Sequence, residues 1–140
     1  MIDPLVLRAS IKIILESQIG TYQFRGGMTE AIAILPDPQL GWQYPEQGTK
    51  VTGLEVVIKQ PVPEVQSNIG GDRTKEYAWS IHLKQWDTTK SLRQAVDLLI
   101  DNLPGEYFIE RVSMMPASDK LLTVEQCKIF LKEWTTNAAI

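Results

Sequence analysis

The sequence contains one cysteine, one histidine and no long apolar run, and each shortage excludes a class of protein. Cys127 has no second cysteine in the chain with which to form a disulfide, so we expect a small buried thiol, which suits a reducing cytoplasm. No apolar stretch approaches the roughly 18 residues of a membrane span. The N-terminus also lacks the basic segment and apolar run of a secretory signal.

The charge balance is mildly acidic, so the chain as a whole has no net positive charge that would attract a polyanion. Fourteen lysines and arginines stand against 17 aspartates and glutamates, which gives a net charge of -3. No segment is noticeably basic, so the sequence shows no electrostatic footprint for DNA or RNA. Hydrophobic residues make up 44% of the 140 positions, which is enough for one core, and this length fits a single domain spanning residues 1–140.

Residues able to carry chemistry are few and scattered. His82 is expected on a strand face beside Lys84, and no second histidine is present to complete a common metal site or to position it as a base. Asp97 and Asp101 share one face of a predicted helix, where a cation would need more oxygen ligands than two. Residues 70–75 lack the spacing of a phosphate-binding loop. We therefore expect no catalytic residue, no cofactor and no metal, and a protein that is not an enzyme.

The first predicted element is a helix that begins at Pro4, with Asp3 as its cap, and ends before Gly20. Its main apolar stripe consists of Leu7, Ile11, Ile14 and Leu15. A second apolar stripe consists of Val6, Ala9 and Ile13. Either the helix is buried on two sides within its own domain, or one stripe contacts a partner subunit.

Alternating apolar side chains predict strands through much of the remaining chain. The predicted elements are strands at 22–24, 31–35, 51–58, 76–86 and 106–113, and a helix that is capped by Asp87 or Thr88 and stops near Leu103. Gly53 indicates a bulge within its strand. Strands 51–58 and 76–86 are expected to pair as an antiparallel hairpin, with a long loop over residues 61–71 at its tip.

Residues 128–135 echo residues 80–87, because Ile, Leu, Lys and Trp fall at the same places in both segments. The shared two-residue period favours a second, similar strand, with Ile81, Leu83, Ile129 and Leu131 directed into the core. The alternative is a final helix, for which Thr123 and Gln126 would supply a capping box. With the strand, the chain is an α+β fold: an antiparallel β-sheet with an N-terminal helix and a second helix packed on one face.

Four features together carry a family resemblance. They are the amphipathic helix over residues 4–18, the strand 31–35 that runs into Leu-Pro-Asp-Pro, the long-tipped hairpin that ends in strand 77–86, and the helix with the sequence SLRQAVDLL that precedes a closing strand pair. In the order of these elements and in their residue patterns, the chain resembles the small tail terminator and tail completion proteins of long-tailed bacteriophages and prophages.

The resemblance implies a structural protein that is assembled in the bacterial host cytoplasm and located in the tail or neck of the virion. Such proteins form homo-oligomeric rings, commonly six-fold, which cap the tail tube and help join it to the head. The implied partners are tail-tube and head–tail connector proteins, with non-specific passage of DNA through the lumen and no membrane.

Surplus apolar side chains indicate where subunits or partners would meet, because contacts around a ring are head-to-tail and need two different patches. The candidate interface residues are Val6, Ile13, Trp42, Tyr44 and Leu98. Two other functions stay open from the residues alone. One is a small cytoplasmic enzyme or ligand-binding domain with a pocket under the long loops, and the other is a cytoplasmic adaptor.

Overall fold

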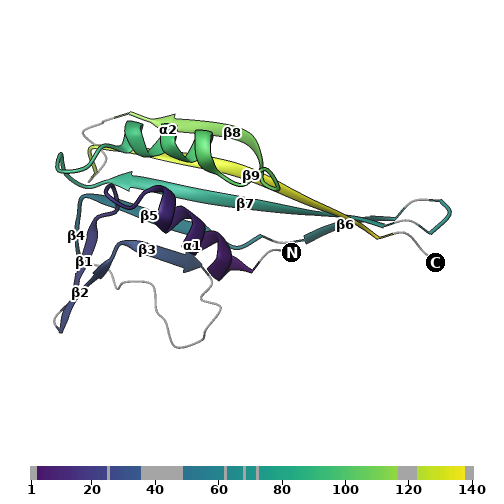
Figure 1. Cartoon of the computed structure of the whole chain (residues 1–140), viewed down its shortest axis with the longest axis horizontal. Helices are drawn as coiled ribbons and strands as arrows, with labels where there is room; N and C mark the ends of the chain where they lie inside the picture. The colour runs from purple at the N-terminus through teal and green to yellow at the C-terminus, as the bar shows by residue number, and fades with distance from the viewer. Residues whose placement is uncertain are drawn as a thin grey trace.

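A computed structural model of the chain describes residues 3–24, 26–35, 49–61, 63–67, 69–71, 73–116 and 123–137. The helices lie on one side of a long sheet, and a smaller sheet stands at one end of the molecule (Figure 1). The elements in chain order are α1 (Pro4–Ile14), β1 (Thr21–Phe24), β2 (Gly27–Glu30), β3 (Ile32–Leu35), β4 (Lys50–Thr52), β5 (Leu54–Lys59), β6 (Pro63–Ser67), β7 (Arg73–Gln85), α2 (Leu92–Asn102), β8 (Phe108–Met115) and β9 (Glu125–Asn137). The α+β class predicted from the sequence is confirmed.

The larger sheet has the strand order β3-β5-β7-β9-β8, and β6 pairs with a further part of β7. Its pairs are antiparallel except that β3 runs parallel to β5, with Ile32 opposite Val56. The antiparallel pairing predicted for the whole sheet is wrong for this pair. The parallel pair is possible because residues 36–53 separate the two strands, and a connection of a dozen or more residues can carry the chain back to its starting edge.

Gly53 divides the strand predicted for residues 51–58 into β4 and β5, which belong to different sheets. β4 joins β1 and β2 in the smaller, antiparallel sheet. Gly53 has a φ of 71°, a backbone conformation that favours glycine, and its N–H donates to Oδ2 of Asp87 at 3.0 Å. The glycine therefore marks a change of sheet, which is a larger break than the bulge expected from the sequence.

A side-chain hydrogen bond fixes the first residue of each helix. The carboxylate of Asp3 accepts from the N–H of Leu5 at 2.8 Å, and Pro4 occupies the first helical position, as predicted. Helix α1 ends at Ile14, earlier than predicted, and Leu15 continues its buried stripe from the turn that follows.

The cap of α2 is Ser91, whose Oγ accepts from the N–H of Gln94 at 3.2 Å. The expected caps, Asp87 and Thr88, were wrong. The carboxylate of Asp87 instead accepts backbone N–H groups of Gly53 and Thr89, which holds the turn between β7 and α2.

The buried stripes of the helices and the inner face of the large sheet form one hydrophobic core. Its fully buried members include Leu7, Ile11 and Leu15 of the α1 segment, Leu92 and Leu99 of α2, and Val56, Ile58, Trp79, Ile81, Leu83, Ile129 and Leu131 of the sheet. The prediction that both helices pack on one face of the sheet is therefore confirmed.

The two echoing segments are neighbouring antiparallel strands, β7 and β9, whose register places Ile81 opposite Ile129. All four side chains predicted to enter the core, Ile81, Leu83, Ile129 and Leu131, are 0% exposed. Residues 125–137 form a strand, so the alternative of a final helix is wrong. The echo arises because both strands present the same alternation to the core beneath α2, which packs against both.

Candidate interaction surfaces

Strand register gathers side chains from four strands on the face of the large sheet that lies opposite the helices. Three rows cross β5, β7, β9 and β8 in that order. The rows are Lys59–Ser80–Phe130–Arg111, Val57–His82–Lys128–Ser113, and Glu55–Lys84–Gln126–Met115. These residues alternate along each strand with the core residues, so their side chains project to the other side.

Four of these residues, Lys59, Lys84, Arg111 and Lys128, carry permanent positive charge, and we call this set the basic face. Lys59 and Arg111 are exposed, and Lys84 and Lys128 are half-buried among their neighbours. Among the described residues, the ion pairs involve none of the four. The basic face was missed from the sequence because its members come from four separate strands and form no basic segment.

The acidic side chains that the structure describes on this side of the sheet, those of Glu55, Glu76 and Glu110, have partners outside the basic face. Glu55 is only 2% exposed and accepts hydrogen bonds from the hydroxyl of Tyr22 at 2.5 Å and from Nε1 of Trp86 at 3.0 Å. Glu76 and Glu110 lie 2.5 and 3.4 Å from Nζ of Lys132. The three rows therefore carry four cations and one carboxylate, that of Glu55, which lies opposite Lys84, while Glu76 and Glu110 pair with Lys132 outside the rows.

His82 lies in the middle of the basic face, with Nε2 at 2.8 Å from Oε1 of Gln126. Burial lowers its pKa, and the nearby ammonium groups of Lys84, Lys128 and Lys59 lower it further, against the opposing effect of the Gln126 hydrogen bond. Because three lysines all lower the pKa of this one imidazole, their charges lie close together, as the strand register also indicates. The described residues show no carboxylate hydrogen-bonded to this ring that would orient it as a catalytic base.

The lowered pKa of His82 predicts that the protein loses stability on acidification. Below a pH of about 6.5 the unfolded chain takes up a proton on this histidine, whereas the folded chain does so only at lower pH. The free energy of unfolding should therefore fall as the pH decreases from about 7.5 through the folded-state pKa. Urea unfolding at pH 7.5 and 5.5 should show a smaller decrease in His82→Gln than in the wild type; equal decreases would contradict the assignment.

A three-stranded ribbon forms the second notable surface. Residues 63–67 of β6, 73–77 of β7 and 133–137 of β9 lie side by side, and Figure 1 shows this part extending well beyond the helices. The loop expected over 61–71 thus contains a strand, because its residues pair with β7. β8 pairs with β9 only as far as Lys132, so within the described chain the outer edges of the ribbon have no strand beside them.

Exposed apolar side chains form the third surface. Of the candidate interface residues, Val6 is 55%, Ile13 75% and Leu98 36% exposed. Trp42 and Tyr44 lie outside the described residues. Further exposed apolar groups that were not predicted include Leu5 and Ile100 on the helices and Val65 and Ile69 on or next to the ribbon.

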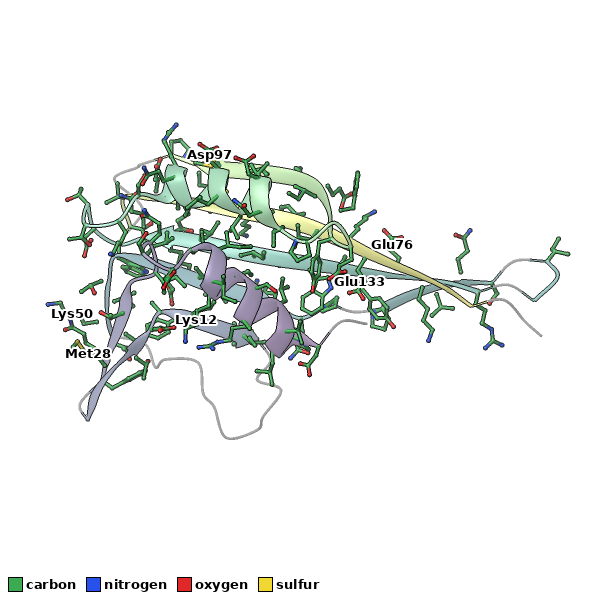
Figure 2. All side chains as sticks on the ribbon, viewed as in Figure 1. Lys12, Met28, Lys50, Glu76, Asp97 and Glu133 are labelled. Atoms are coloured by element: carbon green, nitrogen blue, oxygen red, sulfur yellow. The ribbon has the colours of Figure 1, made fainter. Side chains whose placement is uncertain are left out.

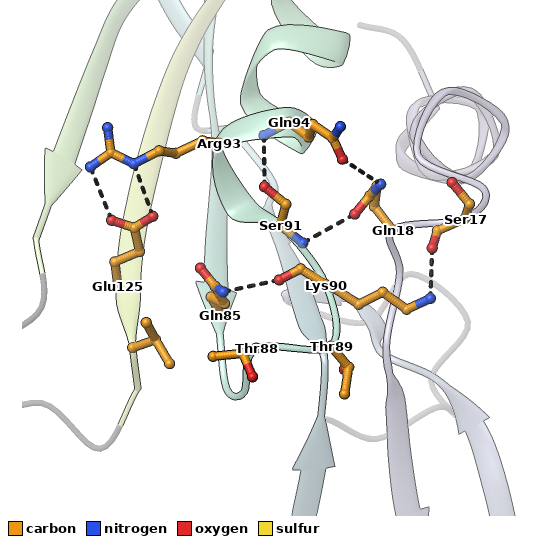
Figure 3. A pocket seen from close by; sticks show the side chains of 11 residues that line it. Ser17, Gln18, Gln85, Thr88, Thr89, Lys90, Ser91, Arg93, Gln94 and Glu125 are labelled. Carbon is orange, nitrogen blue, oxygen red and sulfur yellow. Dashed lines mark hydrogen bonds and ion pairs between the residues drawn. The ribbon is translucent and has the colours of Figure 1, made fainter.

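A polar pocket of about 560 Å³ lies where the α1–β1 turn, the β7–α2 turn and the start of β9 meet (Figure 3). Its polar groups bind one another. Gln18 contacts Gln94 at 3.1 Å, Lys90 donates to the carbonyl of Ser17 at 2.7 Å, and Arg93 lies 3.3 Å from Glu125. Among the described residues this pocket is lined by these turns, and most of the long loop over residues 36–48, under which a ligand pocket was expected, lies outside the described residues.

The remaining candidate residues from the sequence, Asp97, Asp101 and Cys127, do not come together in a site within the described residues. Asp97 and Asp101 are exposed, and Figure 2 shows Asp97 on the outer side of α2. Within the described ranges, no group of three or more histidine, cysteine or acidic side chains is arranged to hold a metal ion. Cys127 is buried as expected, and burial together with the charge of Glu125 raises the pKa of its thiol to about 11.

Comparison with known proteins adds no family to these observations: no family model and no curated protein matches this chain. Neither α1 nor α2, the helices of the described part of the chain, has the length and apolar character needed to cross a bilayer.

Proposed function

We propose that this chain is a structural protein of the tail-terminator class, which forms a ring on a phage or prophage tail tube and helps join the tube to the head. The observation that carries the proposal is the presence of two dissimilar unpartnered surfaces on one subunit. One is the exposed apolar stripe of α1, with Val6 and Ile13. The other is the ribbon, whose outer edges have no strand beside them in the part of the chain that the structure describes.

Two different patches are what a ring requires. In a head-to-tail contact one patch of a subunit meets the other patch of its neighbour, and a suitable rotation closes the series. An open strand edge offers a row of backbone hydrogen-bonding groups to another chain, and exposed apolar residues offer area that association removes from water. The ribbon extends beyond the helices (Figure 1), which leaves it accessible to a neighbouring subunit or to the tail tube.

The proposal predicts that the wild-type protein is a multimer of defined mass in multi-angle light scattering, at least at high concentration or with tail-tube protein present. A mass that corresponds to six subunits, each of 15.8 kDa, would match the commonest ring order of this class. A chain that stays monomeric over the whole accessible concentration range, with tail-tube protein added, would remove the main physical support for a ring.

A ligand-binding domain is the second candidate, and the pocket of Figure 3 is the observation that favours it. A ligand there would have to displace existing hydrogen bonds, since Gln18, Ser91 and Gln94 already bind one another. That exchange gives little net free energy, because each new hydrogen bond replaces one that is lost. We therefore place assembly ahead of ligand binding.

A further inference from the structure

The charges of this protein are segregated, which its net charge of -3 conceals. Adjacent strands lie about 4.8 Å apart, and side chains on one face of a strand repeat about every 6.7 Å. Lys84 and Lys128 occupy neighbouring strands one row apart, with Lys59 and Arg111 on the strands that flank them. Four cations therefore lie within an area only about 15 Å across, three strand spacings, and His82 sits among them.

From this arrangement we infer that the basic face binds the phosphate backbone of duplex DNA, without regard to base sequence. Cations spread over several strands match a ligand that carries a regular series of charges, because each neutralised phosphate releases counterions and adds to the affinity. The inference extends the proposed function to a DNA contact, but it depends only on the sheet face and holds for a single subunit.

Contacts to phosphates are favoured over stacking on bases by the position of Arg111. Its guanidinium carbon lies 4.4 Å from the centre of the Phe130 ring, so the cation covers one face of the phenyl ring that stands within the three rows. Proteins that bind single strands commonly use open aromatic faces as stacking platforms. The polar neighbours Ser80 and Ser113 carry hydroxyl groups that also suit phosphate oxygens.

The test is fluorescence anisotropy with a labelled duplex of about 24 base pairs, titrated with the full-length protein between about 20 and 150 mM salt. If four cations contact phosphates, the logarithm of the binding constant should fall against the logarithm of salt concentration with a slope of about -3 to -4. The double variant Lys84→Gln/Lys128→Gln should bind at least about tenfold more weakly at the lowest salt, with a slope reduced by about 2.

Lys50→Gln is the control, because Lys50 is exposed on β4, a strand of the smaller sheet that contributes no residue to the basic face; Figure 2 shows it at one end of the molecule. This variant should retain wild-type binding apart from the small effect of one charge, and Lys84→Arg/Lys128→Arg should keep binding because the charges remain. Circular dichroism should show that all variants are folded. Light scattering on the same samples separates this test from the ring: DNA binding by a monomer supports the inference even if assembly fails.

Three results would overturn the inference. One is the absence of duplex binding at 20 mM salt. Another is equal loss of binding in the Lys50→Gln control and in the double variant. The third is that the protein binds labelled poly-L-glutamate but not the duplex, and that the double variant loses this binding. That result would assign the basic face to an acidic protein partner instead.

Discussion

Replacing Leu131 with alanine should lower the free energy of unfolding by about 2–5 kcal/mol, the cost of deleting a buried leucine side chain from a core. Leu131 is 0% exposed and lies between Trp79 of β7 and Ile109 of β8 in the sheet. The neighbouring strands are held by their hydrogen-bonded ladders, so they have little freedom to close the cavity that the substitution leaves. Urea denaturation followed by circular dichroism measures the loss.

Leu83→Ala should show a loss in the same range, because Leu83 is also 0% exposed and occupies the equivalent alternation in β7. Leu98→Ala is the matched control: the same atoms are removed from a side chain that is 36% exposed, so the loss should be clearly smaller. If both core variants lose less than about 1 kcal/mol, the assignment of the inner face of the sheet is wrong.

The sequence predicts those features whose signal is local. Burial on one face of a strand repeats every second residue, and burial on one face of a helix repeats every three or four. The burial of Leu83 and Leu99 can therefore be predicted from the residues next to them in the sequence. The echo between residues 80–87 and 128–135 adds a comparison between two segments that experience the same surroundings. It was enough to distinguish a strand from a helix for β9.

Features that depend on distant partners were not predictable in this way. The parallel pairing of β3 with β5 requires a connection that the local pattern does not describe. β6 forms because Val65 and its neighbours find an edge of β7, and nothing in their composition distinguishes this strand from a loop. Gly53 gives a local signal of irregularity, but the change of sheet depends on the partners of the flanking strands, β1 for β4 and β7 for β5.

The basic face demonstrates the same limit for a functional surface. Lys84 and Lys128 are separated by 43 positions between them in the sequence, and each alone resembles an ordinary solvent-facing lysine in a strand. Their proximity depends on the register of β7 with β9, in which His82 lies opposite Lys128. The basic face therefore leaves no basic segment in the sequence. Once β7 and β9 are known to pair, the alternation and register of the two strands bring the charges together.

Assembly is where the second large effect is expected. Ile13→Asp should shift the solution mass from the ring toward a single subunit of 15.8 kDa, while the circular dichroism spectrum stays unchanged. Ile13 is 75% exposed, so the isolated subunit should tolerate a carboxylate at this position. In a ring, the same carboxylate would be buried against apolar groups of a neighbour without a cation to pair with, and a buried unpaired charge is strongly unfavourable.

The control must add the same charge at a place that assembly leaves in water. Thr88→Asp does so, because Thr88 is exposed on the turn between β7 and α2. This variant should keep the multimer, as should Ile13→Val, which preserves most of the apolar surface. If Ile13→Asp assembles as the wild type does, the α1 stripe is not part of the ring contact, and the subunits must meet through the ribbon edges instead. Equal dissociation of Ile13→Asp and Thr88→Asp would show that net charge, and not the α1 stripe, controls assembly.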